Sequence, residues 1–557
     1  MTAPILAVAG LRTEFPTRTG LVTAVDGGSF ALHRGRTLCV VGESGSGKSV
    51  TARSILQIVD RPGRIAAGEI RLNRADGTTT DLARLVPRGR AIRDVRGREI
   101  AMIFQEPMSS LSPVHRVGFQ IGEALQVHFH MPAAERRARV LELLTQVEIP
   151  NPEAAIDRYT FEFSGGMRQR VMIAMALACN PQVLIADEPT TALDVTTQAE
   201  ILDLIKRLQV SHGMAVMFIT HDMGVVAEIA DEVLVMYRGK VMEQGPVERI
   251  FHDPQDAYTR MLIGSAQQLE HKSEIRVARP PLPADRPPVL AVRGLSMVFA
   301  SGLRAVDDVD LEVRPGETLG IVGESGSGKT TLGRCLLRIH EPTAGTIAYR
   351  SADGREIDVR TADRGTLRDV RREMRMIFQD PVASLNPRKT VANIIGEPLR
   401  LAGVRSRERD QQVAELMRQV GLEPAWRERY PHAFSGGQRQ RIGIARAIAL
   451  KPRLVIADEA TSALDVSLRA QMLDLMMRLQ DELGLAFLFI SHDMSVIRYM
   501  CDRVAVMYRG RIVETGPTEQ VTRHPEHDYT KALLSAIPNP DPRERRIHTR
   551  HRYREPA

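Results

Sequence analysis

Four blocks of sequence occur twice in this chain of 557 residues, in the same order. A repeat this long requires two similar domains rather than a solenoid of short units. The separation of the copies falls from 281 residues at the first block to 271 at the last two, so the loops between blocks differ in length. The matched blocks are CVVGESGSGKS (39–49) with GIVGESGSGKT (320–330), MIFQEPMSSLSP (102–113) with MIFQDPVASLNP (376–387), FSGGMRQR (163–170) with FSGGQRQR (434–441), and VLIADEPTTALD (183–194) with LVIADEATSALD (454–465).

The stretch between the two copies predicts the domain boundaries. Four prolines in VARPPLPADRP (278–288) favour an extended spacer over a packed element. We therefore expect a first domain over residues 1–270, a Pro-rich linker over 271–288 and a second domain over 289–540. Residues 541–557 are rich in Pro and Arg and lack apolar periodicity, so we expect a basic disordered tail.

Short apolar runs alternate with helical stretches in each half and indicate the fold class. TLCVVG and TLGIVG lead into glycine-rich loops, and VLIADE, LVIADE, AVMFITHD and AFLFISHD look like buried strands that end at polar residues. Strands that are apolar on both faces and alternate with helices predict an α/β domain with a mainly parallel sheet. Ligands of such sheets bind beyond the carboxyl ends of the strands.

Composition excludes several classes of protein. Hydrophobic residues at 43% and charged residues at 26% are typical of soluble globular chains. Aromatic residues at 4% leave few of the stacking platforms that single-stranded nucleic-acid binders use. The net charge of +7 is weak evidence for an anionic partner, because six arginines against two glutamates in residues 543–557 supply most of it. We expect no nucleic-acid partner.

Cysteine usage and hydropathy predict the compartment. The four cysteines form no CxxC pair, which argues against a disulfide framework or a common zinc site and favours a reducing compartment. No apolar run reaches the ~18–20 residues of a membrane span, and the N-terminus has no basic region ahead of an apolar core. We expect a chain that is neither secreted nor membrane-spanning.

A loop of the pattern G-x-x-x-x-G-K-[ST] lies between an apolar strand and a helix in each half. Its glycines let backbone N–H groups point at phosphate oxygens, its lysine reaches the β- and γ-phosphates, and its hydroxyl binds Mg²⁺. A Gly/Ser-rich turn that merely contains a lysine is the alternative, and two copies in the same context argue against it. The predicted nucleotide-binding loops are Gly42, Glu43, Ser44, Gly45, Ser46, Gly47, Lys48 and Ser49, and Gly323, Glu324, Ser325, Gly326, Ser327, Gly328, Lys329 and Thr330.

Polar residues at the ends of three further strands predict the hydrolytic chemistry. An acidic pair ends one strand, where the Asp can hold Mg²⁺ and the Glu can polarise the attacking water. A Gln after another strand could contact Mg²⁺ or that water, and a His after a third could contact the γ-phosphate. Each type of residue recurs in both halves, which argues against a purely structural role. The predicted residues are Asp187, Glu188, Gln105 and His221 in the first half, and Asp458, Glu459, Gln379 and His492 in the second.

Two further blocks carry a resemblance to a known family. One stretch in each half resembles the signature sequence of ATP-binding cassette (ABC) ATPases. These stretches are Ser164, Gly165, Gly166 and Met167, and Ser435, Gly436, Gly437 and Gln438. TALD (191–194) and SALD (462–465) resemble the D-loop of that family. The resemblance covers nearly all of both halves. It implies two P-loop ATPase domains in tandem, each with a mainly parallel sheet core and a helical subdomain.

The family resemblance also implies how the two halves cooperate. Cassettes pack head to tail, so ATP on the first P-loop should meet the signature at 435–438, and ATP on the second should meet the signature at 164–167. Phe15 and Phe299 match the position of the aromatic residue that stacks on adenine, although a Phe at a strand end is also an ordinary core residue. Every catalytic residue type is present twice, so we predict two hydrolytic sites that use ATP and Mg²⁺.

Two pairs of segments resemble ATPases of the dipeptide, oligopeptide and nickel importer family. The first pair follows Gln105 and Gln379, and the second covers residues 245–264 and 516–540. This resemblance implies two transmembrane permease subunits, which dock on the helical subdomains, and an extracytoplasmic solute-binding protein. It predicts a peripheral protein at the cytoplasmic face of the inner membrane that powers uptake of small peptides or related solutes such as glutathione. The family's C-terminal cysteine cluster is missing here, so we expect no iron–sulfur group.

A soluble tandem-cassette ATPase that acts on ribosomes or nucleic acid is the alternative function. Ribosome-acting chains of that kind usually join their halves by a long charged helical linker, and DNA-repair types carry zinc cysteines. This linker is short and Pro-rich, and the zinc spacing is missing. The importer interpretation is therefore favoured.

Overall fold

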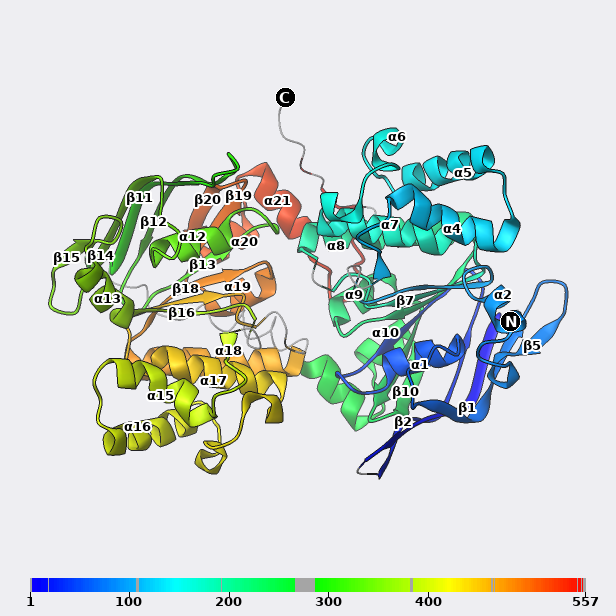
Figure 1. Ribbon diagram of the computed structural model, residues 1–557, viewed down its shortest axis with the longest axis horizontal. Helices are drawn as coiled ribbons and strands as arrows, with labels where there is room; N and C mark the ends of the chain where they lie inside the picture. Colours follow the sequence, from blue (N-terminus) through cyan, green and yellow to red (C-terminus); the bar gives the residue numbers. More distant parts are fainter. Residues whose placement is uncertain are drawn as a thin grey trace. The chain divides into compact units, whose positions relative to one another are not determined.

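The computed structural model describes residues 3–18, 20–106, 110–191, 193–265, 286–380, 384–461, 464, 466–547, 549–551 and 553. The chain divides into two compact units (Figure 1), Met1–Gly264 with Ala536–Arg550, and Ser265–Ser535 with His551–Ala557. Most of the expected linker lies outside the described residues. The segment Ala536–Arg550 belongs to the first unit, whereas the composition predicted a separate, disordered tail from residue 541.

The first unit contains two sheets. A four-stranded antiparallel sheet has the order β2-β1-β4-β5, and a six-stranded sheet has the order β10-β9-β3-β8-β7-β6, in which only the β9–β10 pair is antiparallel. The strands are β1 (Leu6–Thr17), β2 (Gly20–Leu32), β3 (Thr37–Val41), β4 (Arg64–Asn73), β5 (Thr79–Asp81), β6 (Ile100–Ile103), β7 (Val183–Asp187), β8 (Ala215–Ile219), β9 (Glu232–Tyr237) and β10 (Lys240–Pro246). The α-helices are α1 (Lys48–Ile55), α2 (Arg90–Val95), α4 (Val117–Phe129), α5 (Ala133–Gln146), α6 (Pro152–Ala155), α7 (Gly165–Leu177), α8 (Val195–His212), α9 (Met223–Ile229) and α10 (Val247–His252).

The second unit repeats this plan. Its sheets have the orders β12-β11-β14-β15 and β16-β17-β18-β13-β19-β20, and only the β19–β20 pair of the larger sheet is antiparallel. The strands are β11 (Leu290–Val298), β12 (Arg304–Val313), β13 (Thr318–Val322), β14 (Ala344–Arg350), β15 (Glu356–Asp358), β16 (Met374–Ile377), β17 (Leu454–Asp458), β18 (Ala486–Ser491), β19 (Arg503–Tyr508) and β20 (Arg511–Pro517). The α-helices are α12 (Lys329–Leu336), α13 (Arg364–Glu373), α15 (Val391–Leu401), α16 (Ser406–Gln419), α17 (Gly436–Ile448), α18 (Val466–Leu483), α19 (Met494–Met500), α20 (Thr518–Arg523) and α21 (Asp528–Ser535).

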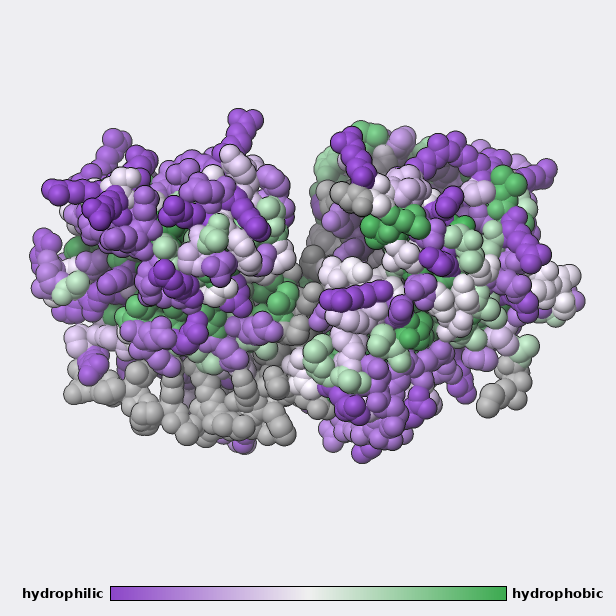
Figure 2. All heavy atoms as spheres, turned by 90° about the horizontal axis from the view of Figure 1, so that it is seen from below, coloured by the Kyte–Doolittle hydropathy of each residue, from purple (hydrophilic) through white to green (hydrophobic). Residues whose placement is uncertain are grey.

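The central strands of each larger sheet are buried on both faces, as their apolar sequences predict. Every residue of β3, β7 and β8 is buried, and so is every residue of β13, β17 and β18. Each unit has a hydrophobic core between its two sheets. Figure 2 shows hydrophilic residues over most of the viewed face, with hydrophobic residues in small groups. The predicted α/β class with a mainly parallel sheet is confirmed in both halves.

Three helices in each unit pack together beside the sheets and form the predicted helical subdomain. These are α4, α5 and α7 in the first unit, and α15, α16 and α17 in the second (Figure 1). The loops that carry the motifs follow the carboxyl ends of the parallel strands, as in other sheets of this kind. The fold therefore gathers residues that lie more than a hundred positions apart in sequence at one edge of each sheet.

Candidate functional site

Each glycine-rich loop connects a buried strand to a helix. β3 ends at Val41 and α1 begins at Lys48, and Gly47 between them has a φ of 100°. A Cβ atom on Gly47 would lie 2.3 Å from the carbonyl oxygen of Ala24. Gly328 has a φ of 105°, and its Cβ would lie 2.1 Å from the carbonyl oxygen of Ala305. Only glycine can occupy these positions, because both the backbone conformation and the space exclude a side chain.

The loop lysine points back into its own loop in both units. Lys48 Nζ donates to the carbonyl oxygens of Gly42 at 2.7 Å and Glu43 at 2.9 Å. Lys329 makes the two equivalent contacts at 2.7 and 2.6 Å. Both lysines are buried, so the ammonium group is held in the cradle where a phosphate would lie.

A hydroxyl and a carboxylate meet beside each loop, as expected for a magnesium site. Ser49 Oγ donates to Asp187 Oδ1 at 2.8 Å, and Thr330 Oγ1 donates to Asp458 Oδ1 at 3.0 Å. Burial raises the pKa of both aspartates, and the hydroxyl hydrogen bond opposes this effect. Oxygen donors of this type suit Mg²⁺, which binds through one or two protein groups and fills its other positions with water and phosphate. The donor set therefore fits the predicted metal.

Glu188 lies at the centre of a polar cluster in the first unit. Gln105 Nε2 and Thr191 Oγ1 both donate to Glu188 Oε2 at 2.9 Å, and His221 Nδ1 lies 3.2 Å from Oε1. The Glu188 side chain is 14% exposed. Its backbone has a φ of 47°, in the left-handed region. Gln105 thus contacts the glutamate that was predicted to act as base.

The second unit builds the same cluster around Glu459. Gln379 Nε2 donates to Glu459 Oε2 at 2.7 Å, and His492 Nδ1 lies 3.1 Å from Oε1. Glu459 also has a φ of 47°. The same left-handed backbone and the same side-chain contacts therefore occur in both halves. A strained backbone persists only where its surroundings hold it, so its recurrence indicates a functional constraint.

Electrostatics keep the two glutamates ionised. Burial, the largest single effect, would raise the pKa of Glu188 and Glu459. The hydrogen bond and charge of the neighbouring histidine, together with the loop lysine and a hydroxyl or amide donor, outweigh it, so the pKa of each glutamate lies below its ordinary value. Burial would lower the pKa of His492, and the contact with Glu459 instead raises it. An ionised carboxylate beside a histidine is a suitable general base for activating water.

The signature residues begin a helix in each unit. Ser164 is the N-cap of α7, and its side chain accepts from Met167 N at 3.3 Å. Ser435 caps α17 in the same way and forms a capping box with Gln438, whose Oε1 accepts from Ser435 N at 3.0 Å. Backbone N–H groups at such a helix start favour an anion.

The structure places the two candidate adenine-stacking residues inside their own units. Phe15 is half-buried on β1 and packs near Gly63. Phe299 packs against the core of the second unit and contacts His340 edge-on, with ring centroids 5.7 Å apart. Stacking on adenine stays a prediction for both. Part of each predicted D-loop, residues 192, 462, 463 and 465, lies outside the described residues.

Two tyrosines that the sequence interpretation missed contact the glycine-rich loops. Glu43 N donates to the hydroxyl of Tyr258 at 3.2 Å, and Glu324 N donates to the hydroxyl of Tyr529 at 3.1 Å. Tyr258 also packs against Tyr237, with ring centroids 4.4 Å apart. Both tyrosines lie in the repeated stretches after the last strands, at an offset of 271 residues, and that recurrence was the signal that could have revealed them.

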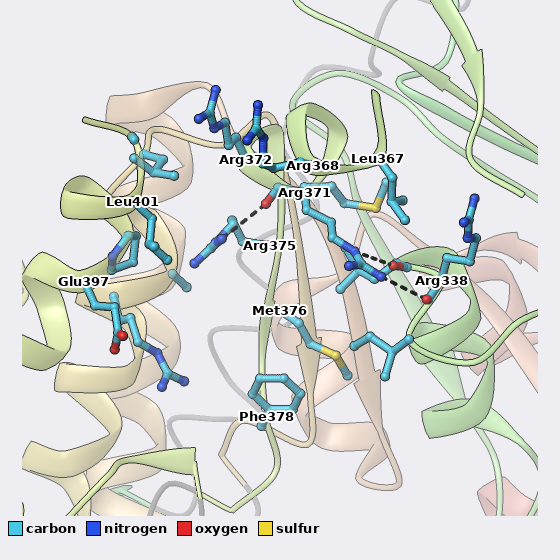
Figure 3. Close-up of a pocket in the computed structure, with 18 of the residues that line it drawn as sticks. Arg338, Leu367, Arg368, Arg371, Arg372, Arg375, Met376, Phe378, Glu397 and Leu401 are labelled. Carbon is cyan, nitrogen blue, oxygen red and sulfur yellow. Dashed lines mark hydrogen bonds between the residues drawn. The ribbon is translucent and has the colours of Figure 1, made fainter. Parts of the chain in front are cut away.

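An arginine-rich cavity of about 960 Å³ lies in the second unit, where β16 faces α15 and α17 (Figure 3). Arg375 on β16 and Arg446 on α17 line it, with Glu397 of α15 and the exposed ring of Phe378. Arg446 Nη1 donates to the carbonyl oxygen of Ser384 at 2.7 Å. The cavity lies directly beside the strand end that carries Gln379.

Two of the arginines that line this cavity, Arg375 and Arg446, are specific to the second half. In the aligned repeat, Ala101 stands where Arg375 is, and Met175 stands where Arg446 is. Burial lowers the pKa of both arginines, and the charge of Arg446 lowers that of Arg375 further. At these two positions the second unit carries basic side chains where the first unit carries uncharged ones.

Comparison with known families agrees with this geometry. The ABC transporter family matches residues 25–191 and 306–462, which contain every predicted catalytic and signature residue except the two histidines and the two phenylalanines. The chain is an ABC transporter ATPase. The oligopeptide/dipeptide transporter C-terminal region matches residues 242–288 and 513–555, which contain the tyrosines that contact the glycine-rich loops. The chain thus combines two cassettes with two copies of a peptide-transporter extension.

The chain is similar over its full length to curated relatives. It is 49% identical to the glutathione import ATP-binding protein GsiA of Salmonella choleraesuis (strain SC-B67), over 99% of this chain and 91% of the relative. It is 48% identical to GsiA of Escherichia coli (strain K12), over 97% of this chain and 91% of the relative. A solved structure of cbiO1 from Clostridium perfringens, part of the ABC transporter complex cbiONQ, aligns with 42% of this chain and 91% of its own, at 26% identity and a TM-score of 0.39.

The family matches and the curated relatives confirm the predicted family and ATPase activity. No helix among the described residues is long and apolar enough to cross a membrane.

Proposed function

We propose that this ATPase drives a membrane permease that imports small peptides or related solutes such as glutathione. The observation that carries the proposal is the duplicated cluster of glycine-rich loop, hydroxyl–Asp pair and Glu–His–Gln triad. The relatives named for glutathione import support the solute class. Powering a permease requires a repeated cycle of ATP binding and hydrolysis, and these residues can supply both.

Within each site we assign roles from the contacts described above. Ser49 with Asp187, and Thr330 with Asp458, hold Mg²⁺, which neutralises phosphate charge when bound. Glu188 and Glu459 accept a proton from the attacking water. His221 and His492 orient those glutamates and face the γ-phosphate, while Gln105 and Gln379 donate to the same glutamates and contact Mg²⁺ or the attacking water. Phe15 and Phe299 stack on adenine.

The two halves act as a head-to-tail pair in this proposal. ATP on the loop with Lys48 contacts the signature that begins at Ser435, and ATP on the loop with Lys329 contacts the signature that begins at Ser164. The helix N-termini at these serines offer N–H groups to the γ-phosphate. ATP therefore holds the halves together, and hydrolysis releases them.

The permease subunits dock on the helical subdomains at the cytoplasmic face of the inner membrane. The cavity between β16, α15 and α17 supports this assignment, because it combines the exposed Phe378 with the arginines 375 and 446 next to Gln379. An extracytoplasmic solute-binding protein delivers the solute to the permease from the other side.

The test replaces Glu188 and Glu459 by Gln, singly and together, in the complex with its permease in proteoliposomes. The double variant should bind ATP but lose turnover and uptake by about 10²–10⁴-fold, the contribution of a general base. Glu135→Gln, on an exposed face of α5, is the matched control and should keep both activities. Brisk hydrolysis by the double variant would contradict the assigned base.

Uptake of labelled glutathione and of dipeptides by the unmodified complex tests the solute class. ATP-dependent uptake of either supports the proposal. Full ATP turnover by the isolated chain together with association with ribosomes, and with no permease, would overturn the transport function.

A further inference from the structure

Two carboxylates lie buried close together in the first unit, outside the site described above. Asp203 is on α8, and its side chain is 10% exposed; Glu228 is on α9, and its side chain is fully buried. α8 begins after its N-cap Asp194 in the predicted D-loop, and α9 begins after its N-cap Asp222, which directly follows His221. These two helices thus carry two loops of the ATP site.

The counter-ion of this pair is Arg550, from the C-terminal segment. Its Nη1 donates to Asp203 Oδ1 at 2.9 Å and to the carbonyl oxygen of Ala199 at 3.0 Å, and its Nη2 lies 3.4 Å from Glu228 Oε2. The Arg550 side chain is 5% exposed. Two buried carboxylates repel each other unless a cation is placed between them, so this arginine stabilises the contact between α8 and α9.

Glu228 also anchors the backbone of the segment that carries Arg550. It accepts hydrogen bonds from the N–H groups of Asn539, Arg546 and Ile547 at 3.0–3.1 Å. Arg545 adds a hydrogen bond to the carbonyl oxygen of Ala230 at the end of α9. The segment is therefore built onto α9 by several contacts, which explains why it belongs to the first unit although its composition predicted disorder.

The second unit links the equivalent helices with its own side chains. In the aligned repeat, Asp474 corresponds to Asp203 and Tyr499 corresponds to Glu228, and the Tyr499 hydroxyl donates to Asp474. Arg469 on α18 adds an ion pair with Asp493 at 2.7 Å, the residue after His492.

The first unit has a weaker contact in place of the Arg469–Asp493 ion pair. Gln198 stands in place of the arginine, and its Nε2 is 3.4 Å from Asp222 Oδ2. The helices α8 and α9 are thus joined less strongly by their own residues than α18 and α19 are.

We propose that Arg550 is a positioning residue for the first ATP site: it ties α8 to α9 and so holds the D-loop start and His221 in register. This inference rests on the proposed function of that site. Misplacement of reacting groups by about 1 Å can lower a rate 10²-fold, so a link between the two helices can control turnover without touching ATP. The second half needs no such residue, because Tyr499 takes the place of the acid.

The test replaces Arg550 by Met in the full chain that also carries Glu459→Gln, so that only the first site hydrolyses ATP, and measures ATP turnover. We expect kcat to fall about tenfold while KM for ATP stays within twofold, since the loop that holds the phosphates is not contacted. Arg543→Met is the matched control, because Arg543 is exposed in the same segment, and it should leave kcat unchanged. Arg550→Lys keeps the cation and should retain at least threefold more activity than Arg550→Met.

A second variant separates positioning from stability. Glu228→Tyr copies the second half, and in that background Arg550→Met should no longer lower kcat. The proposal is overturned if Arg550→Met keeps full kcat, or if the Glu228→Tyr background does not rescue it while thermal unfolding is unchanged. Failure of the function proposed for the first site would instead show as full turnover by the double variant Glu188→Gln with Glu459→Gln, so the two failures are distinguishable.

Discussion

The backbone conformation and a backbone hydrogen bond fix the direction of the Glu188 and Glu459 side chains in the same way in both halves. Each residue has a φ of 47°, which a glutamate rarely adopts, and its N–H donates to the strand that carries the neighbouring histidine, at Ile219 in the first unit and at Ile490 in the second. The bend aims the carboxylate at the histidine. The acidic pairs and histidines were visible in the sequence, but their mutual contact was a consequence of strand order.

The Glu459–His492 pair predicts a pH dependence with a definite sign. The pKa of Glu459 is lowered from its ordinary 4.5, so its share of the pair's stabilisation is present above pH 4.5 and is lost as pH falls through the lowered pKa. The pKa of His492 is raised from 6.5, so its share is fully present below pH 6.5 and is lost as pH rises through the raised pKa. The pair is strongest between these limits.

Replacing His492 by Ala should raise the pKa of Glu459, because burial then acts without the opposing histidine. We expect the acid limb of the profile of turnover against pH to move to higher pH, and His221→Ala to act in the same direction through Glu188. His524→Ala, at the end of α20, is the control and should leave the limb in place. An unchanged acid limb in both site variants would contradict the pairing.

At the scale of elements, the two helical subdomains share a fold and differ in charge. α17 has a capping box between Ser435 and Gln438, and α7 has the N-cap Ser164 without a Gln partner, because Met167 occupies that place. The cavity beside α15 has two arginines where the first half has Ala101 and Met175. A partner helix with acidic side chains would complement the arginines of this cavity better than it would complement Ala101 and Met175.

The double variant Arg375→Ala with Arg446→Met gives this cavity the residues that the first half has at the two matched positions. We expect the permease to stimulate its ATP turnover at least fivefold less than that of the unmodified chain, because the two arginines nearest Gln379 and α15 are lost from the cavity. Arg418→Ala, on the exposed face of α16, is the control and should keep full stimulation. The measurement is turnover with and without permease in proteoliposomes, and equal stimulation of both variants would exclude this groove as the docking site.

At the scale of the whole molecule, each unit has its own core between two sheets, and the C-terminal segment Ala536–Arg550 completes the first unit. Separate cores predict two thermal transitions. A ligand that binds the folded state at 100 times its Kd adds about 2.7 kcal/mol to the free energy of unfolding of the unit that binds it.

Lys48→Ala and Lys329→Ala should each remove the nucleotide stabilisation of one transition. ADP with Mg²⁺ is the ligand for this measurement, because ADP lacks the γ-phosphate that the other half's signature would contact. Differential scanning calorimetry should show that each variant loses the ADP-induced rise in only one Tm. Loss of both rises in a single variant would contradict independent nucleotide loops.

The sequence by itself determined the duplication and the strand–loop–helix pattern, and it predicted the residues proposed for both ATP sites, because each depends on short motifs whose chemistry is local. Only the tertiary structure showed which distant residues contact each other. Tyr258 and Tyr529 contact the glycine-rich loops, and Arg550 lies between Asp203 and Glu228. Composition predicted disorder for the basic tail because an arginine-rich segment has no apolar face to bury. A buried carboxylate pair some 310–350 residues earlier supplies the missing reason for it to order, and separations of that length leave no local pattern in a single sequence.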